Sequence, residues 1–540
     1  MAGLATVFGS GAMTNSIAEI ADAGCIFAIG TNTTQTHPVI ALEAFKAKDK
    51  GAKLIVVNPR EIRLCKRADI WLQHRPGTDV AILMGIMRVI LDEGLIDEEF
   101  IRERCENFDA FRESVYEFDL DAVERITGVP RGQVIEAART YSTARPATIL
   151  YTMGITQHAH GTDNVMALGN LAMLTGNVGK PSSGVNPLRG QNNVQGSCDM
   201  GSLPDVFTGY QKVANPEVKE KFEKAWDITL DPNPGLTITE MFERAADGRI
   251  KAMYVVGENP VLTEPSASHA EEAMKKLEFL VVQDMFLTET AKLAHIVLPA
   301  ASFAEKDGSF TNTERRVQLV RQAIEPLGDS QADWLIMAQV ARRMGASGFD
   351  YSSASDVMEE AASLTPSSCG ISLERLEDTS LQWPCPSHDH LGTPILHIGE
   401  FSRGKGKFVP LKYVPPTEPP DEEYPLVLTT GRSLFQYHTG TMTRKVRGLN
   451  ALSGEEWVEI NPADASKLNV DDGDSVRVVS RRGQVTARAR LTDASSPGVV
   501  FMTFHFAESP TNVLTNPAVD PVSKTPELKV AAVRVERVGA

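Results

Sequence analysis

A set of three short apolar segments occurs twice in the sequence, and this repeat restricts the possible fold more than any other feature. The first copy consists of CIFAIGTN (25–32), LIVVNPRE (54–61) and ADIWLQH (68–74), and the second of MYVVGENP (253–260), LVVQDMF (280–286) and AHIVLPA (294–300). Gly30 and Asn58 lie 28 positions apart, and Gly257 and Asp284 lie 27 positions apart. Matching segments at matching spacing indicate an internal duplication.

Continuous apolar runs that alternate with helical stretches are typical of buried parallel strands in a doubly wound α/β sheet. Such sheets bind ligands beyond the carboxyl ends of their strands. Asp79 is also expected to cap the helix that follows it. The first sheet edge offers Gly30, Asn32, Asn58, Arg60, Gly77 and Asp79 as cofactor contacts, and the second offers Gly257, Asn259, Gln283, Asp284 and Thr288.

Two related sheet edges suggest two related nucleotide-like ligands. Neither copy has the glycine-rich turn of dinucleotide-binding folds or a P-loop, so ordinary NAD or ATP binding is not expected. The alternative is that the duplication is architectural and that these polar residues only form turns.

A polar loop at 184–201, GVNPLRGQNNVQGSCDMG, has the character of a ligand site. It contains four glycines, five amide side chains and one cation, Arg189. Glycines allow backbone amides to approach a ligand closely, and a guanidinium offers a planar fork for a small carboxylate. Arg189 and Gln191 are therefore the candidate catalytic residues. A surface loop with a solvated arginine is the alternative.

The prolines and acids of VPPTEPPDEEYP (414–425) predict a linker, and the segments after it alternate as strands of a β domain with a hairpin at Arg482 and Gly483. The expected domains are a first α/β domain (1–145), a second, related one that contains the polar loop (146–345), an irregular segment (346–423) and a C-terminal β-barrel (424–540). Further cofactor candidates lie in loops of the second and fourth of these: Gly154, Gln157, Gly431, Arg432, His438, Thr439, Asn512 and Lys524.

Composition excludes several functions. A formal charge of −16 argues against a nucleic-acid surface. The six cysteines form no C-x-x-C pair, which argues against an iron-sulfur or zinc framework of usual spacing in this chain. The pairs His158/His160 and His388/His390 lack a third ligand nearby, so no metal ligand is assigned. No apolar run of membrane-spanning length and no signal sequence is visible. Scattered thiols in a large acidic protein suggest a reducing compartment, so we expect a cytoplasmic location.

The run LAMLTGNVGKPSSGVNPLRGQNNVQGSCDMGSLPD (171–205) resembles the active-site segment of molybdenum or tungsten bis-pterin formate dehydrogenases, catalytic alpha subunits of the molybdopterin oxidoreductase family. The likeness extends over essentially the whole chain. It implies two molybdopterin guanine dinucleotides (bis-MGD), with the barrel closing over them. It also implies that Arg189 holds formate beside the metal while Gln191 and the neighbouring amides fix the loop.

The implied reaction is oxidation of formate to CO2, or the reverse, with transfer of a hydride or of a proton and two electrons. Partner subunits with iron-sulfur clusters or flavin would carry the electrons. The family's four-cysteine cluster segment and its metal-ligating Cys or selenocysteine are expected upstream of Met1, and a selenocysteine codon read as a stop would explain this. We therefore expect the chain alone to be inactive. A nitrate reductase and a non-catalytic scaffold are the alternatives.

Overall fold

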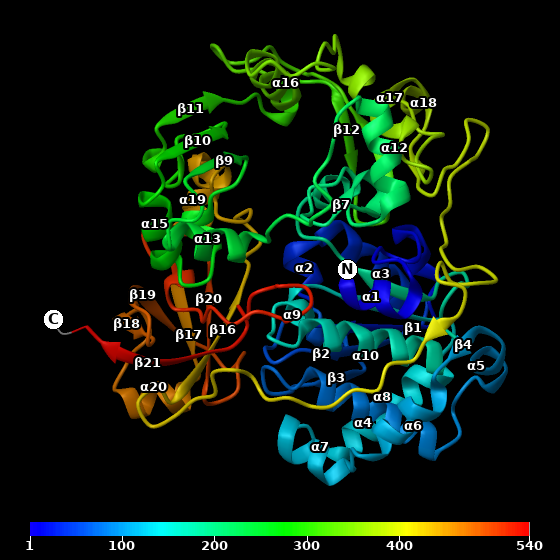
Figure 1. Ribbon diagram of the computed structural model, residues 1–540. Helices are drawn as coiled ribbons and strands as arrows, with labels where there is room; N and C mark the ends of the chain where they lie inside the picture. The colour runs from blue at the N-terminus through cyan, green and yellow to red at the C-terminus, as the bar shows by residue number, and fades with distance from the viewer. Residues whose placement is uncertain (539–540) are drawn as a thin grey trace. The chain divides into compact units, whose positions relative to one another are not determined.

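The computed structural model describes residues 1–538, and the chain divides into two compact units (Figure 1). The first unit contains residues 1–188, the short segment 262–267, and the chain from 395 onward. The second contains 189–261 and 268–394. Each unit is described below by itself.

The first unit begins with a five-stranded parallel sheet in the order β3-β2-β1-β5-β6. Its strands are β1 (Cys25–Ile29), β2 (Lys53–Val57), β3 (Ile70–Leu72), β5 (Ala147–Tyr151) and β6 (Gly184–Pro187). Ile26 and Ala28 of β1 pack into one apolar core, whereas Cys25, Phe27 and Ile29 pack into another. Alternate residues of one strand therefore face two cores, as a doubly wound sheet requires.

Ten α-helices lie within residues 1–188 of the first unit, and all except α2 add residues to one of the two cores. They are α1 (Ala2–Phe8), α2 (Thr33–Thr36), α3 (Pro38–Asp49), α4 (Asp79–Asp92), α5 (Glu98–Arg104), α6 (Phe108–Tyr116), α7 (Leu120–Thr127), α8 (Arg131–Thr143), α9 (Met153–Thr156) and α10 (Gly161–Leu174). Helix α3 begins at Pro38, a residue whose fixed φ suits the first helical position. Helix α4 begins at Asp79, so Thr78 and not Asp79 occupies the cap position, and Asp79 adds negative charge to the first turn.

Residues 426–537 contain a closed six-stranded barrel, as the sequence predicted. Its strands are β16 (Leu426–Gly431), β17 (Trp457–Ile460), β18 (Ser475–Val479), β19 (Gln484–Leu491), β20 (Val499–Thr503) and β21 (Ala531–Arg537), with helices α19 (Arg447–Leu452) and α20 (Pro462–Leu468) between them. Inward positions alternate along β19, which gives the barrel a continuous apolar core.

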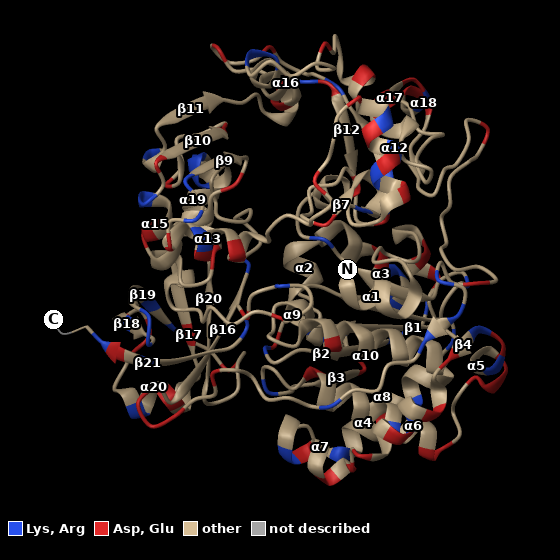
Figure 2. Cartoon of the chain, in the orientation of Figure 1, with Lys and Arg blue, Asp and Glu red and all other residues tan. Residues whose placement is uncertain are grey.

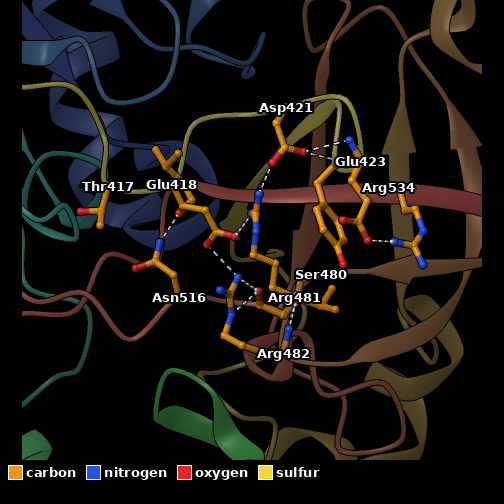
Figure 3. A network of polar contacts seen from close by, with 12 residues as sticks. Thr417, Glu418, Asp421, Glu423, Ser480, Arg481, Arg482, Asn516 and Arg534 are labelled. Atoms are coloured by element: carbon orange, nitrogen blue, oxygen red, sulfur yellow. Dashed lines mark hydrogen bonds and ion pairs between the residues drawn. The ribbon is translucent and has the colours of Figure 1, made fainter.

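The linker before the barrel is fastened by charge, as Figure 3 shows. Glu418 pairs with Arg481 and Arg482 of the turn between β18 and β19, and the Arg482 contact measures 2.8 Å. Asp421 also pairs with Arg481. The segment is irregular because of its prolines, yet it has a defined course along the barrel.

The second unit contains a three-stranded parallel sheet in the order β11-β10-β9, formed by β9 (Ala252–Val256), β10 (Phe279–Asp284) and β11 (Ile296–Pro299). Helices α13 (Ile238–Ala246) and α15 (Ala267–Lys275) contribute to its apolar core. The other elements of residues 189–394 are α11 (Val194–Asp199), β7 (Val206–Phe207), β8 (Gln211–Lys212), α12 (Pro216–Trp226), α14 (Pro260–Thr263), β12 (Gly308–Thr311), β13 (Arg316–Val320), α16 (Asp333–Arg343), α17 (Ala354–Ser363), α18 (Leu373–Asp378) and β14 (Leu381–Gln382).

The repeat seen in the sequence is present in the backbone. Gly30 donates its N–H to the carbonyl of Val57 at 3.1 Å, and Gly257 donates to Gln283 at 2.9 Å. Both glycines have positive φ, which glycine adopts without strain. The strand orders β3-β2-β1 and β11-β10-β9 correspond one to one. The α/β fold class with parallel sheets and a C-terminal barrel is therefore confirmed.

The boundary predicted between residues 145 and 146 does not coincide with the division seen in the structure. Strand β5 pairs with β1 and β6 pairs with β5, so both belong to the first sheet. The sequence grouped them with the following loop because an apolar strand carries no mark of which sheet it joins. The second unit instead starts at Arg189, directly after β6.

Charges of both signs alternate on exposed helices such as α12, where Figure 2 shows lysines and glutamates side by side. Within residues 1–538, no helix combines the length and the apolar character needed to cross a membrane.

Candidate functional site

Arg189 is held by an amide relay within the second unit. Its Nε donates to Oε1 of Gln195 at 2.7 Å, and its backbone N–H donates to the Thr313 hydroxyl at 3.0 Å. Gln195 in turn donates through Nε2 to Oδ1 of Asp199 at 2.7 Å. Gln195 and Asp199 lie four positions apart on α11, so both side chains project from the same face of that helix.

Asp199 receives several hydrogen bonds in a buried position. The Tyr210 hydroxyl donates to Oδ1 at 2.8 Å, and the indole N–H of Trp383 donates to Oδ2 at 2.6 Å. Burial raises the pKa of this carboxyl, while Tyr210, Gln195, Trp383 and Arg189 act in the opposite direction. The donors satisfy both carboxylate oxygens, as a buried charge requires.

Neighbouring elements hold this relay in place. The Thr311 N–H on β12 donates to Oδ1 of Asn193 at 2.8 Å, which ties the polar loop to the β12–β13 hairpin. Arg315, 0% exposed, donates to the carbonyl oxygens of Trp383, Thr393 and Pro394. Its neighbour Arg316 pairs with Glu314 at 2.8 Å, so both adjacent arginines make contacts within the protein.

Gln191 is half-buried in the same loop. The amide that fixes Arg189 is that of Gln195, which the sequence grouped with four other amides and could not single out. In the sequence, only the four-residue spacing of Gln195 and Asp199 could have indicated that these two side chains interact. Gln191 stays a candidate for contact with a ligand.

At the edge of the first sheet, Gly30 and Gly154 pack against each other. Gly154 donates its N–H to the carbonyl of Gly30 at 3.0 Å, and a Cβ on Gly154 would lie 2.5 Å from that oxygen. Both must be glycine for this reason alone. Asn32 contacts Gln35 at 2.7 Å at the start of α2, and Gln157 ends α9 with its side chain half-buried.

Asn58 and Arg60 form the turn after β2, where Asn58 Oδ1 accepts from the Arg60 N–H at 3.1 Å. The Arg60 guanidinium makes a bidentate pair with Glu459 of β17, at 2.6 and 2.7 Å, and lies over the ring of Phe501. It lines a cavity of about 750 Å³ together with Arg432. This volume suits a nucleotide-sized ligand.

Asp79 is 2% exposed and lies between two histidines. Its Oδ1 is 3.1 Å from Nε2 of His74, and its Oδ2 is 3.6 Å from Nε2 of His158. Burial opposes ionisation, but the two histidines outweigh it and hold the pKa of Asp79 below its usual value. Gly77 has positive φ and packs on Pro416, where a Cβ would lie 2.3 Å from the proline ring.

The second sheet edge brings its candidates together by internal hydrogen bonds. Asn259 accepts from the Thr290 hydroxyl at 2.7 Å and donates to Glu289 at 2.9 Å, and Gln283 donates to Asp333 at 2.8 Å. Thr288 caps the turn at Ala291. Gly257 is exposed. Asp284 accepts from the Phe286 N–H at 3.0 Å, as Asn58 accepts from Arg60, and burial raises its pKa.

The barrel loops hold a cluster of basic groups. Arg432 contacts the Met153 sulfur at 3.6 Å, and Lys529, 9% exposed, donates to the carbonyl of Thr430 at 2.8 Å. Burial, followed by Arg432, lowers the pKa of Lys529 to about 7. Burial also lowers the pKa of His438 to about 3 and that of His505 to about 4.

No carboxylate in residues 1–538 forms an ion pair with Arg432, Lys529, His438 or His505. Lys529 and His505 were missed in the sequence, where nothing distinguishes them from other isolated basic residues.

The remaining barrel candidates are placed as follows. Gly431 packs on Phe501, and Thr439 bonds the Thr441 hydroxyl at 3.0 Å. Asn512 donates to the carbonyl of Leu262 at 2.8 Å, while its own buried Oδ1 accepts no hydrogen bond from the residues that the structure describes. Lys524 has positive φ in a turn closed by its N–H and Asp520.

No group of three or more His, Cys, Asp or Glu side chains in residues 1–538 is arranged to bind a metal ion. His158 belongs to the surroundings of Asp79 instead, and its Nε2 also lies 2.8 Å from the carbonyl of Gly154. Nδ1 of His160 lies 3.9 Å from Oδ2 of Asp163. The six cysteines are all free, and burial raises the pKa of Cys198 beside the relay.

Comparison with known proteins decides the family. The molybdopterin oxidoreductase family matches residues 3–343, and the molybdopterin dinucleotide binding domain matches residues 426–532. The chain belongs to the molybdopterin oxidoreductase family. The second match coincides with the closed barrel, which places the basic cluster in the domain that binds the cofactor in this family.

Similar proteins cover almost the whole chain. The F420-dependent formate dehydrogenase subunit alpha of Methanocaldococcus jannaschii is 51% identical over 539 residues, 99% of this chain and 80% of the relative. Formate dehydrogenase H of Escherichia coli is 39% identical, over 99% of this chain and 76% of the relative. The structure of acetylene hydratase from Pelobacter acetylenicus aligns with a TM-score of 0.79 at 20% identity, covering 99% of this chain and 80% of that one, and shares the fold.

The residues present fit a molybdopterin dinucleotide. Arg432 and Lys529 are basic groups in a largely desolvated setting without a carboxylate partner in residues 1–538, and a bound anion such as a pyrophosphate would favour the protonated form of the Lys529 amine. The orphan Oδ1 of Asn512 and the orphan Nδ1 of His158 are further buried polar atoms that a ligand could satisfy.

Proposed function

We propose that this protein is the catalytic subunit of a formate dehydrogenase that oxidises formate to CO2, or runs in reverse. The observation that supports this best is Arg189, a cation that is fixed by Gln195 and lies in the polar loop two positions after the end of β6. Relatives named formate dehydrogenase, at 39 to 51% identity, cover that loop and the rest of the chain. A guanidinium is the side chain best suited to hold a small carboxylate.

Formate oxidation breaks the C–H bond of HCOO⁻ and yields CO2, one proton and two electrons, and a bound molybdenum or tungsten bis-pterin centre would accept the electron pair. Arg189 would orient the carboxylate through its Nη atoms, because its Nε is committed to Gln195. Gln191 would contact the substrate from the same loop. Partner subunits with iron-sulfur clusters or flavin would carry the electrons away.

We infer that the cofactor consists of two molybdopterin guanine dinucleotides, one served by each sheet edge. Arg432, His438 and Lys529 would hold phosphate or pterin oxygens. The cavity lined by Arg60 and Arg432 has space for one nucleotide. Asp79 and Asp284 would accept hydrogen bonds from the guanine N–H groups.

Substitution of Arg189 in the purified holoenzyme tests the substrate assignment. Lys keeps the charge but loses the planar fork, and Ala removes both. A hydrogen bond to a charged group contributes about 1.5 to 3 kcal/mol, so Arg189→Lys should lower kcat/KM for formate about ten- to a hundredfold, and Arg189→Ala by more. Arg249→Lys, which changes a surface ion pair in the same unit, is the control.

Metal and nucleotide content should be unchanged in these variants. Full formate turnover by the alanine variant at full metal content would exclude Arg189 as the substrate anchor. Turnover of nitrate but not formate by the wild type would indicate a nitrate reductase, and protein without molybdenum or tungsten would indicate a scaffold.

A further inference from the structure

The hydrogen bonds of Arg189 continue through the Gln195 amide to the carboxylate of Asp199. Arg189 donates to the oxygen of the Gln195 amide, and the nitrogen of the same amide donates to Asp199. The negative end of the amide dipole thus faces the cation and the positive end faces the anion. Only one orientation of Gln195 satisfies both neighbours, because its oxygen cannot donate and its nitrogen cannot accept.

Asp199 is held more firmly than a carboxylate at a surface. Trp383 and Tyr210 each donate to it from separate elements, and it is 7% exposed. Tyr210 has a φ of 60°, a strained value for an aromatic residue, so the surrounding structure holds its hydroxyl in place. Arg315, fully buried, anchors the backbone of Trp383 through its carbonyl.

We propose that Asp199 is a positioning residue for Arg189: through Gln195 it fixes the direction of the guanidinium and balances its charge. This inference rests on the proposed function of Arg189 as the formate anchor. Loss of the Asp199 charge weakens Gln195 as an acceptor for Nε, and the guanidinium then samples orientations that do not receive formate. The hydrogen bond from its Nε to Gln195 distinguishes Arg189 from an arginine whose guanidinium contacts only water.

The test is Asp199→Asn in the purified holoenzyme. The new amide keeps the volume, removes the charge and replaces one of two acceptor oxygens by a donor: either Oδ1, to which Gln195 and Tyr210 donate, or Oδ2, to which Trp383 donates. We expect the KM for formate to rise about tenfold and kcat to change less than about threefold, since a misdirected anchor weakens binding first. Gln195→Met, which breaks the relay in the middle, should have the same effect and keeps the test valid if the asparagine variant does not fold.

The matched control is Glu360→Gln. Glu360 also accepts from a tryptophan and a tyrosine of the same unit, Trp226 at 2.9 Å and Tyr351 at 2.6 Å, but it has no contact with the relay. The Glu360→Gln substitution should leave the KM for formate unchanged. An equal effect of both substitutions would show that the loss of any hydrogen-bonded carboxylate acts through folding, and it would overturn the proposal.

A double-mutant cycle separates positioning from a general structural role. If Asp199 acts through Arg189, then Asp199→Asn should change kcat/KM less than about twofold in the Arg189→Ala background, against about tenfold in the wild type. Equal factors in the two backgrounds would overturn the proposal. A fall in metal content in step with activity, with KM unchanged, would do so as well.

Chemical modification gives a readout independent of turnover. Phenylglyoxal labelling of the peptide that contains Arg189, followed by mass spectrometry, should proceed several times faster in Asp199→Asn, and protection should require about ten times more formate. Unchanged labelling and protection would contradict the relay. If Arg189→Ala itself leaves formate kinetics intact, the proposed function fails; if only the Asp199 and Gln195 variants are silent, this inference alone fails.

Discussion

Lys529 shows how a single residue acquires a role through burial. Its neighbours Thr430 and Arg432 lie about a hundred positions away in sequence and meet it only because β16 and β21 are adjacent in the barrel. An ammonium group in such a place is costly unless an anion accompanies it. The same burial without a nearby anion lowers the pKa of Lys529 in the protein without ligand and would favour a bound cofactor anion beside it.

The stability of cofactor-free protein should report this buried amine. The pKa of Lys529 is about 7 in the fold, whereas an unfolded lysine titrates near 10.4. Between these values the unfolded chain binds the proton and the folded chain does not, so the free energy of unfolding rises with pH.

From about pH 7 to about pH 9, wild type should gain up to about 1.4 kcal/mol per pH unit relative to Lys529→Met. Urea unfolding at several pH values measures this. Lys467→Met, at an exposed lysine, should show no such slope. Parallel pH curves for wild type and Lys529→Met would contradict a neutral buried amine.

At the scale of elements, the ends of β1 and β5 come together through two glycines. The sequence predicted Gly30 and Gly154 as separate cofactor contacts, which stays a prediction, and the structure shows that each leaves space for the other. Side-chain patterns predict strands and helices well, because the period of burial is local. They do not predict which turns touch, because that depends on the strand order.

Gly154→Ala should destabilise the protein by about 1 to 3 kcal/mol, since its Cβ would meet the backbone of Gly30 and neither turn can move freely. Gly132→Ala is the control. Gly132 lies in helix α8 with no atom near the position of a Cβ, so this change should stabilise by about 0.5 to 1 kcal/mol. Chemical unfolding of both variants gives the comparison. Equal stability of the two would show that the close approach of the turns is not a constraint.

At the scale of the whole molecule, the duplication and the barrel could be predicted from the sequence. Repeated apolar segments indicate the duplication, and alternating segments separated by turn residues indicate the barrel. The partners of Arg189 could not be singled out. Gln195 was one amide among five, and Asp199, Tyr210 and Trp383 gain meaning only where α11 and the segment after β14 meet. Likewise, the buried carbonyl partners of Arg315 lie about 70 to 80 positions away in the sequence and are visible only in the fold.

The duplication yields a stoichiometric prediction. If both sheet edges bind a dinucleotide, acid release and chromatography should find two guanine nucleotides per metal in the wild type. Asp284 follows β10 as Asn58 follows β2, and each accepts from the backbone N–H two residues on. A carboxylate oxygen of Asp284 would accept a hydrogen bond from guanine at the second sheet edge, and Asp79 would do the same at the first.

Asp284→Asn and Asp79→Asn should each therefore lower the count toward one, because an amide in place of the carboxylate loses an acceptor for the guanine N–H groups. Glu360→Gln should leave the count at two. A wild-type count of one would mean that the second copy kept the fold of the first without its ligand. A count of two that neither substitution lowers would mean that other residues recognise the base.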